Sequence, residues 1–464
     1  MGETTSLINT GRGRGLHPAT RFALRAALRL ALAGACLHGG AAHAIGLLQA
    51  YEAALKNDPT YRAAYYDNES GKEFAVIGRA NVLPSVSANY SYNKNRADIE
   101  AETNTGDPTH THPRYVSRSG ALQLRQPLFN LEAAARYKQG IAQSNVSAAQ
   151  FKLRGQDLVM RLVGAYLDAL FAGEELALAQ AHRDAFIEQR KVNDKLFERG
   201  EGTRTDMLET QARLDVAEAA VLEAQDEEVT ARNTLSGIVG IDIRSVDRLG
   251  PGFKVRPQAQ GGFEAWKARA LASNPEIQAQ LYAVEAAGEE MARSRGAHAP
   301  KLDLVAAYTT NESDTINTLH QHAAIKSIGL QLNIPLYSGG QASAVSRQAV
   351  AAHERAKADL QARIEKILIE VRKEHNASIS SDAKIAALEK AVASGELLVK
   401  ATEQSIKGGV RINLDLLNAR QQMFSTRRDL SHARYNYFLS SLRLRAAAGA
   451  LGREDVRELA AHFQ

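Results

Sequence analysis

Two histidines lie close enough in the sequence to hold a metal ion together. His110 and His112 fall in the segment 96–118, which also carries four acidic residues: Asp98, Glu100, Glu102 and Asp107. Imidazole nitrogens and carboxylate oxygens are common zinc ligands. Such a mixture in one loop is more often solvated than metal-bound, so we predict no metal site and no cofactor.

Enzyme chemistry has little support elsewhere in the chain. Cys36 is the only cysteine, so no disulfide forms within the chain, and no thiol nucleophile exists beyond residue 44. The glycine-rich stretch 11–15 is not a phosphate-binding loop, because no Gly-Lys-Ser/Thr follows it. HExxH, nucleophile-elbow and dinucleotide motifs are absent from the sequence. We predict that the protein is not an enzyme.

The basic charge of the chain belongs to its first 44 residues. They hold five arginines and one acid, so without them the formal net charge falls from +5 to +1. This balance predicts no nucleic-acid binding. The arginines precede a short apolar stretch, residues 30–37, and an Ala-His-Ala ending at Ala44. We interpret residues 1–44 as a secretory signal peptide cleaved after Ala44.

Two alternatives remain for this segment. The true start codon could lie downstream, because the arginine-rich beginning is long for a signal. Cys36 could instead be a lipidated N-terminus, although the preceding Ala33-Gly-Ala35 lacks the leucine expected three positions before such a cysteine.

The elements that position these residues can be inferred from proline placement. Prolines are absent between Pro127 and Pro251 and after Pro335, and both stretches are rich in good helix formers. A helix over residues 130–199 would be about 100 Å long at about 1.5 Å per residue. A helix of that length needs a partner along its apolar stripe, which predicts coiled-coil packing. Beyond residue 45 no apolar run is long enough for a membrane-spanning helix.

Four segments alternate between apolar and polar residues as strands do. They cover residues 85–93, 122–125, 302–309 and 328–334, and loops are expected at 96–118 and 312–326. Strands of about ten residues with one apolar face are typical of membrane barrels, while a small soluble sheet is the alternative. Four strands cannot close a membrane barrel, so a membrane location requires several chains to share one.

The sequence pattern also predicts that the chain contains one structural unit twice. Leu55–Pro59 corresponds to Leu271–Pro275, and Gly237 and Gly240 correspond to Gly449 and Gly452. We predict a first repeat at 45–250, a linker at 251–262 and a second repeat at 263–464, each with helix, two strands and long helices.

The mature sequence resembles a known family of outer-membrane channels. Leu47–Tyr51 and Ala54–Pro59 at the front, and Leu430–Tyr437 and Gly449–Gly452 at the back, are similar to TolC-type channel proteins. The resemblance implies an α+β fold in which three chains share a twelve-stranded barrel in outer-membrane lipid. A twelve-helix tunnel continues into the periplasm. The implied function is an exit duct for type I protein secretion or drug efflux, joined through a periplasmic adaptor to an inner-membrane transporter.

The resemblance also assigns residues at the periplasmic mouth. Asp415 falls on the first aspartate of a constricting D-x-x-D motif, and Asn418 replaces the second, so only one ring would be charged. The alternative for Asp415 is a helix cap. Arg411 falls on the latch arginine and Thr205–Asp206 on its Thr-Asp partner, whereas Ile406 replaces the latch tyrosine.

Two turns correspond to the adaptor-docking tips. They are Arg199-Gly200-Glu201 and Gly408-Gly409-Val410, and both depart from the Val-Gly-x form of the family. The difference from the family form would be explained by a dedicated adaptor protein. Alternatively, the glycines only terminate helices as C-caps.

Other classes of protein remain as alternatives. A periplasmic coiled-coil adaptor, a structural coiled coil of an export complex and a soluble hydrolase share parts of the pattern. None of these three classes requires four strands long enough to span a membrane.

Overall fold

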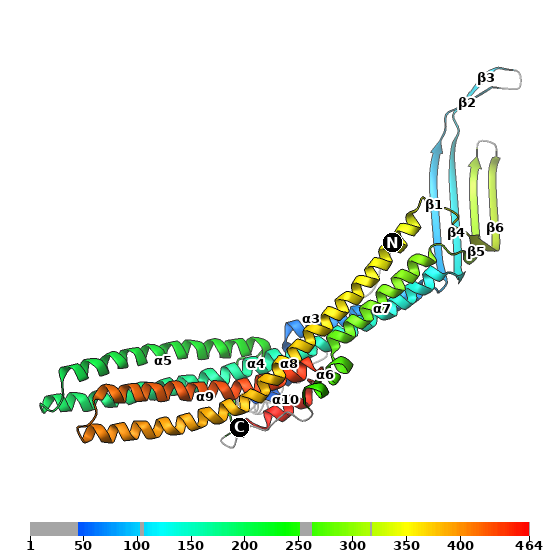
Figure 1. The fold of residues 1–464 in the computed structure, drawn as a ribbon. Helices are drawn as coiled ribbons and strands as arrows, with labels where there is room; N and C mark the ends of the chain where they lie inside the picture. The colour runs from blue at the N-terminus through cyan, green and yellow to red at the C-terminus, as the bar shows by residue number, and fades with distance from the viewer. Residues whose placement is uncertain (1–44, 103–105, 251–261, 316–317, 464) are drawn as a thin grey trace, which may run out of the picture.

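The computed structural model describes residues 45–102, 106–250, 262–315 and 318–463. The chain forms a long, bent rod with a β-sheet at one end and two helical hairpins at the other (Figure 1). The proposed signal segment, Cys36 and residues 251–261 of the proposed linker lie outside the described residues. Among the described helices, none is long and apolar enough to cross a membrane.

Helices make up the rod and most of the described chain. Their bounds are α2 (Leu47–Asn57), α3 (Pro59–Ala80), α4 (Leu131–Glu198), α5 (Arg204–Val239), α6 (Gly262–Ser273), α7 (Pro275–Gly296), α8 (Gln341–Lys407), α9 (Asn413–Ala447) and α10 (Arg453–Ala460). The long helix expected over 130–199 is confirmed within one residue at each end. At 68 and 67 residues, α4 and α8 each extend about 100 Å.

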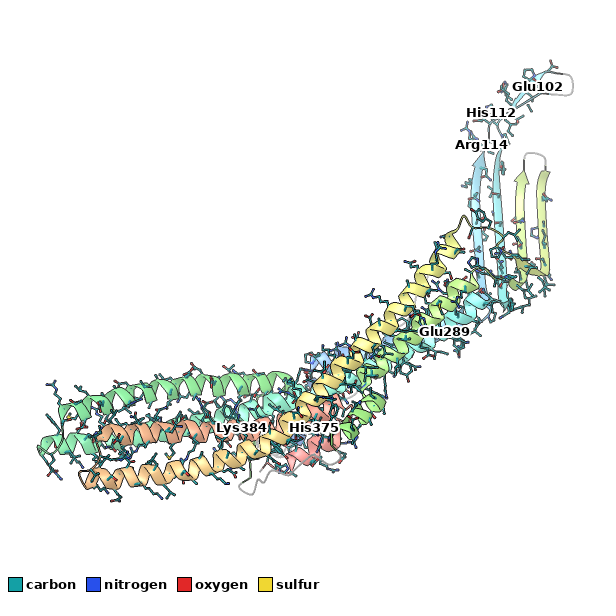
Figure 2. All side chains as sticks on the ribbon, viewed as in Figure 1. Glu102, His112, Arg114, Glu289, His375 and Lys384 are labelled. Atoms are coloured by element: carbon teal, nitrogen blue, oxygen red, sulfur yellow. The ribbon has the colours of Figure 1, made fainter. Side chains whose placement is uncertain are left out.

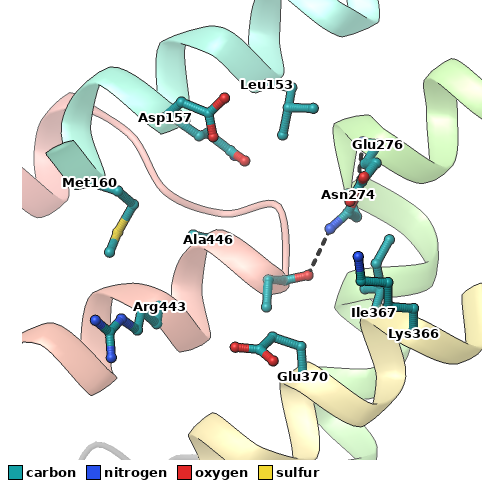
Figure 3. Close-up of a pocket in the computed structure, with 12 residues that line it drawn as sticks. Leu153, Asp157, Met160, Asn274, Glu276, Lys366, Ile367, Glu370, Arg443 and Ala446 are labelled. Atoms are coloured by element: carbon teal, nitrogen blue, oxygen red, sulfur yellow. Dashed lines mark hydrogen bonds between the residues drawn. The ribbon is translucent and has the colours of Figure 1, made fainter. Parts of the chain in front are cut away.

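The two helices that lead to the sheet begin in the same way. Asp58 caps α3 and Asn274 caps α7, and proline occupies the first helical position after each cap, where its missing N–H costs nothing. The Asp58 carboxylate accepts the backbone N–H of Tyr61 at 2.6 Å. The Asn274 amide also donates to the carbonyl of Ala447 at 2.8 Å, at the edge of a cavity of about 300 Å³ where α4, α7, α8 and α9 meet (Figure 3).

Asp58 is fixed to the long helix as well as to its own. Arg161 on α4 donates both terminal nitrogens to its carboxylate, at 3.0 and 3.1 Å. Burial alone would raise the pKa of this carboxyl. The bonds from Arg161 and from the backbone outweigh burial, so the pKa of Asp58 lies below its ordinary value.

The sheet contains four antiparallel strands in the order β1-β4-β5-β6. These are β1 (Ser85–Arg96), β4 (Arg114–Phe129), β5 (Lys301–Thr315) and β6 (Thr318–Asn333). The middle pairing joins the two halves of the chain, with Leu122 opposite Tyr308. Both outer strands, β1 and β6, have one edge without a partner in the described chain.

The loops expected between the strands are wrong in extent. The 96–118 segment contains a second hairpin, β2 (Ile99–Glu102) with β3 (Pro108–Thr111), and β4 already begins at Arg114. The 312–326 segment is mostly strand, since β5 continues to Thr315 and β6 starts at Thr318. The sequence did not predict these extensions, because polar residues on both faces of a strand leave no alternation of apolar and polar positions.

The main apolar core lies midway along the rod. It is formed by α2, α10, the middle of α4, the C-terminal end of α5 and the second half of α9, around Leu162, Tyr166 and Phe438. The Tyr166 hydroxyl donates to the carbonyl of Ile45 at 3.1 Å and accepts the N–H of Asp247 at 3.2 Å. Burial raises the pKa of Tyr166, so the phenol stays protonated.

Small residues let α3 and α4 approach closely above this core. A Cβ added at Gly140 would lie 2.3 Å from the carbonyl oxygen of Phe74, and one at Gly78 would lie 3.0 Å from that of Arg136. Glycine is required here by space rather than by backbone conformation.

Candidate functional site

The turns selected from the sequence lie together at the end of the rod opposite the sheet. The α4–α5 hairpin and the α8–α9 hairpin both end there (Figure 1). Gly200 and Gly409 adopt left-handed conformations with φ of +75° and +74°. The residues after them donate to helix carbonyls in the same way, Glu201 to Leu196 and Val410 to Ser405, each at 2.9 Å. These glycines are therefore helix C-caps, and this is compatible with docking.

Asp206 closes the start of α5. It forms a capping box with Thr203, whose hydroxyl accepts the Asp206 N–H at 3.1 Å while the carboxylate accepts the Thr203 N–H at 3.2 Å. Thr205 is exposed beside it. The Asp206 carboxylate therefore already has a hydrogen-bond partner, Thr203, within its own turn.

Arg411 and Asp415 pair with each other at the second tip. Arg411 Nη1 lies 3.7 Å from Asp415 Oδ2, and the two side chains are 51% and 39% exposed. The helix-cap alternative for Asp415 is wrong, because Ile412 is the N-cap of α9 and makes no side-chain cap bond. Within one chain Arg411 pairs with Asp415 rather than with Thr205–Asp206, so the latch stays a prediction for contacts between chains.

Asn418 lies one helical turn beyond Asp415. Its side-chain oxygen accepts a hydrogen bond from Arg213 on α5 at 3.1 Å. Asn418 therefore forms a contact between the two hairpins. An amide in place of a carboxylate leaves the Arg213 charge uncompensated at this contact.

A buried polar network that was not predicted also joins the two hairpins. Asn193, Thr210 and Asn413 are 4%, 0% and 8% exposed. The Asn193 and Asn413 amides donate to the Thr210 hydroxyl at 2.7 and 3.2 Å. Gln189 donates to the Asn193 and Asn413 oxygens, at 3.1 Å in both cases. The Thr210 hydroxyl donates a hydrogen bond to the carbonyl of Asp206 at 2.8 Å, which links the network to the first tip.

The sequence contained a signal for this network. Asn193 follows the buried Ala179 and Phe186 at intervals of seven, and Thr210 precedes the buried Ala217 at the same interval. A polar residue at a core position of a coiled coil usually fixes register.

Arginines connect α9 to its neighbours above the tips. Three pairs repeat every seven residues along α9 and α8: Arg420–Glu403 at 2.9 Å, Arg427–Glu396 at 2.6 Å and Arg434–Glu389 at 2.9 Å. We call these three pairs the ladder. Arg420 also donates to the carbonyl of Ala185 on α4 at 2.8 Å, so it holds three helices together.

His182 fills the space beside Arg420. Its ring stacks on Phe424 of α9 at 4.4 Å and meets Phe186 edge-on at 4.6 Å. Burial, with a smaller contribution from the charges of Arg420 and Arg213, lowers the pKa of His182 to about 4. The ring is therefore a neutral aromatic spacer at neutral pH.

The two histidines considered as metal ligands lie at the opposite end of the molecule. Figure 2 shows His112 and Glu102 in the β2–β3 hairpin, beyond the four-stranded sheet. His110 pairs with Glu100 at 3.4 Å and His112 with Asp98 at 3.5 Å, so each histidine has one carboxylate. Among the described residues, no three metal-binding side chains converge.

Known proteins show the same sequence pattern. The chain matches the family described as "Outer membrane efflux protein" over residues 50–241 and 266–450. It belongs to this family. The resemblance to TolC-type channels inferred from the sequence is therefore confirmed.

Two relatives have names that refer to protein secretion. The alkaline protease secretion protein AprF of Pseudomonas aeruginosa is 41% identical over 428 residues, covering 91% of this chain and 88% of the relative. The proteases secretion protein PrtF of Dickeya chrysanthemi is 36% identical, with coverages of 92% and 93%. The outer membrane protein TolC of Vibrio cholerae is 26% identical over 417 residues.

Solved structures of channels share the fold. A membrane protein from Pseudomonas aeruginosa has a TM-score of 0.76 at 20% identity, covering 89% of this chain and 92% of that one. The outer-membrane channel OprN gives 0.76 at 18% identity, with coverages of 88% and 90%.

Family membership decides the function class. This efflux-family chain is part of an outer-membrane exit duct for secretion or efflux, and its helical part extends into the periplasm. The periplasmic adaptor and the structural coiled coil are thereby set aside as alternatives.

Proposed function

We propose that three copies of the chain form one duct that passes proteins to the cell exterior. The open four-stranded sheet carries this proposal, because its β1 and β6 edges lack partners in the described chain. Lipid cannot satisfy the backbone groups of an open edge, and the smallest membrane barrels have about eight strands. Three copies would close a barrel of twelve strands.

The helices favour the same assembly. Leu208 and Leu222 on α5 are 61% and 63% exposed, and Ile379 and Leu397 on α8 are 53% and 68% exposed. These apolar side chains are left exposed within one chain. Apolar stripes on such long helices need a partner. The α8 stripe of a neighbouring copy would cover the α5 stripe.

Protein is the proposed cargo. AprF and PrtF, which are 41% and 36% identical to this chain, are named for protease secretion. An inner-membrane transporter would supply the cargo through a periplasmic adaptor. The exposed turns Arg199–Glu201 and Gly408–Val410 are the proposed docking points, and Val410 is 81% exposed there.

The tip residues would form the entrance. In a trimer, Asp415 would supply one ring of three carboxylates, and Asn418 would supply a neutral ring. Carboxylate rings favour cations. Arg411 would exchange its bond to Asp415 for one to Thr205 or Asp206 of the adjacent chain, since ion pairs at exposed sites are weak.

Processing follows from the same proposal. Residues 1–44 would be removed on export, and residues 251–262 would connect the repeats 45–250 and 263–464. The mature chain would then contain no cysteine.

A cysteine-free background makes the trimer directly testable. Ser91→Cys on β1 is combined in turn with Ser327→Cys and Gln331→Cys on β6, and each protein is oxidised in the membrane. We expect covalent trimers from at least one pair, whereas Ser91→Cys alone gives at most dimers. A monomeric mass in native detergent, with no cross-link from either pair, would refute the shared barrel.

Single-channel recording in planar lipid bilayers tests the entrance. We expect Asp415→Ala to lower cation preference and Asn418→Asp to raise it, because the two changes remove and add three charges per trimer. Arg411→Ser should increase conductance. Unchanged selectivity in both charge variants would show that these rings do not line the entrance.

A further inference from the structure

The apolar face of the sheet ends in a row of cations. Along β1 and β4, residues on this face include Val86 and Ala88, then Leu122 and Leu124, in register across the ladder. The same face continues to four cations toward the β2–β3 end of the sheet: Lys94, Arg96, Arg114 and Arg118. We call these four residues the cationic rim. All of its side chains are exposed.

Two members of the cationic rim oppose each other directly. Arg96 is the register partner of Arg114, at the last rung of the β1–β4 ladder. Figure 2 shows Arg114 at this end of the sheet. Like charges directly opposite on one face destabilise a sheet. Within the described residues, neither guanidinium has a carboxylate within ion-pair distance, so nothing in this part of the chain neutralises the pair.

The acids near the cationic rim have other partners. Glu312 on β5 lies 3.4 Å from Arg118, which also sits over the Tyr92 ring at 5.6 Å. Glu100 on β2 lies 3.4 Å from His110 on β3, and Asp98, just before β2, lies 3.5 Å from His112, just after β3. Of these three carboxylates, only Glu312 lies at ion-pair distance from a member of the cationic rim, and none of them reaches the Arg96–Arg114 pair.

The height of the cationic rim matches a lipid headgroup layer. Arg118 lies six residues along β4 from Leu124, or about 20 Å at about 3.4 Å per residue, and Arg114 lies about 14 Å further. Apolar bands of membrane barrels are about 25 Å tall and end in aromatic girdles. Tyr90 occupies the rung between the apolar residues and the cations, and Tyr92 lies opposite Arg118 on the next rung of this face, as in an aromatic girdle.

We propose that the cationic rim binds the phosphate groups of phosphorylated lipids in the outer leaflet. This inference rests on the proposed function, because it requires the strands to cross the membrane. The opposed Arg96–Arg114 pair forms the centre of the site, and one phosphate accepts hydrogen bonds from both guanidinium groups. Arginine suits this role because its planar fork matches phosphate oxygens.

The experiment uses the purified mature protein in a nonionic detergent. Thermal unfolding is followed while lipopolysaccharide, dephosphorylated lipopolysaccharide or inorganic phosphate is added. Three variants are compared with the wild type. They are Arg96→Gln/Arg114→Gln, the charge-preserving Arg96→Lys/Arg114→Lys, and Arg347→Gln/Arg355→Gln on the periplasmic helix α8, which removes the same charge elsewhere.

We expect lipopolysaccharide to stabilise the wild type with a half-saturating concentration about thirtyfold lower than for the double glutamine variant. The α8 control should match the wild type, and the lysine variant should fall between. Dephosphorylated lipid and millimolar inorganic phosphate should not reproduce the shift.

Equal responses of the glutamine variant and the wild type would overturn the proposal. A full response to inorganic phosphate alone would rule out a lipid as the source of the ligand. Conductance of the same preparations separates the two levels of inference. A pore without a phosphate-dependent difference refutes only the lipid site, whereas absence of any pore refutes the proposed function.

Discussion

Replacing Asn413 by alanine tests whether the buried network fixes the entrance hairpins to each other. The Asn413 side chain is 8% exposed and makes the only contacts within the network that come from α9. Its removal deletes the bonds to Gln189 and Thr210. Gln189 keeps its bond to Asn193, and Thr210 keeps its bonds to Asn193 and the Asp206 carbonyl. No buried group is therefore left without a partner.

The magnitude follows from this count. Two neutral hydrogen bonds contribute about 0.5–1.5 kcal/mol each, so the docking of α9 weakens by about 1–3 kcal/mol. The population with an undocked tip then rises about 5- to 150-fold. The rest of the fold is unaffected, because the main core lies midway along the rod.

Thiol labelling measures that population in the cysteine-free mature chain. Leu417→Cys places a thiol at a position on α9 that is fully buried against Phe186 and Leu214. The labelling rate of this variant is compared with and without Asn413→Ala. Asn418→Ala serves as the matched control, since it removes one exposed bond on the same helix and should change the rate by about twofold at most.

A rate increase no larger than that of the control would refute the reasoning. Combining Gln189→Ala with Asn413→Ala provides a further check. The effects of the two substitutions should be less than additive, because both remove the same bond.

Three further predictions concern packing and charge. Gly140→Ala should lower the free energy of unfolding by about 1–3 kcal/mol, because the added Cβ would collide with the Phe74 carbonyl. As a control, Gly155→Ala on the same helix has open space around it and should raise the melting temperature. Arg427→Glu should destabilise the α8–α9 hairpin by about 1 kcal/mol at low salt, and adding Glu396→Arg should restore it; a melting temperature that is not restored would contradict a direct pairing. The folded-state pKa of His182, about 4, lies below its ordinary 6.5, so the unfolded chain binds the proton more tightly. Stability should therefore be constant above about pH 6.5 and fall by up to about 3 kcal/mol toward pH 4, and His182→Phe should flatten this part of the denaturation profile.

Much of the fold followed from elementary patterns in the sequence. The helix α4 lies within one residue of its predicted bounds, because seventy residues without proline leave few alternatives. The four strands of the main sheet were found by alternation where one face is apolar. The β2–β3 hairpin was missed because its residues are exposed on both faces, so no pattern distinguishes it from a loop.

The site was only partly predictable for a different reason. Family resemblance located the two tips, and the glycine geometry there agrees with that location. It did not reveal the partners of individual side chains, since those depend on how one hairpin sits on another. Asp415 pairs with Arg411 in its own turn, and Asn418 accepts a bond from Arg213. The sequence places Asn193 at a core position of the coiled coil, but its hydrogen-bond partners are known only once the opposing helices are in place.

The contacts between the two hairpins are of two kinds, apolar and directional. Leu417 of α9 packs against Phe186 and Leu214 of the α4–α5 hairpin, and the ladder joins α8 to α9. The buried, directional bonds of Asn413 fix the position of α9 on the α4–α5 hairpin. Hydrogen bonds tolerate only a few tenths of an ångström, whereas apolar contacts re-form after a small slide. We therefore expect the buried network to determine how much free energy opening requires, while Asp415 determines which ions pass through the open entrance.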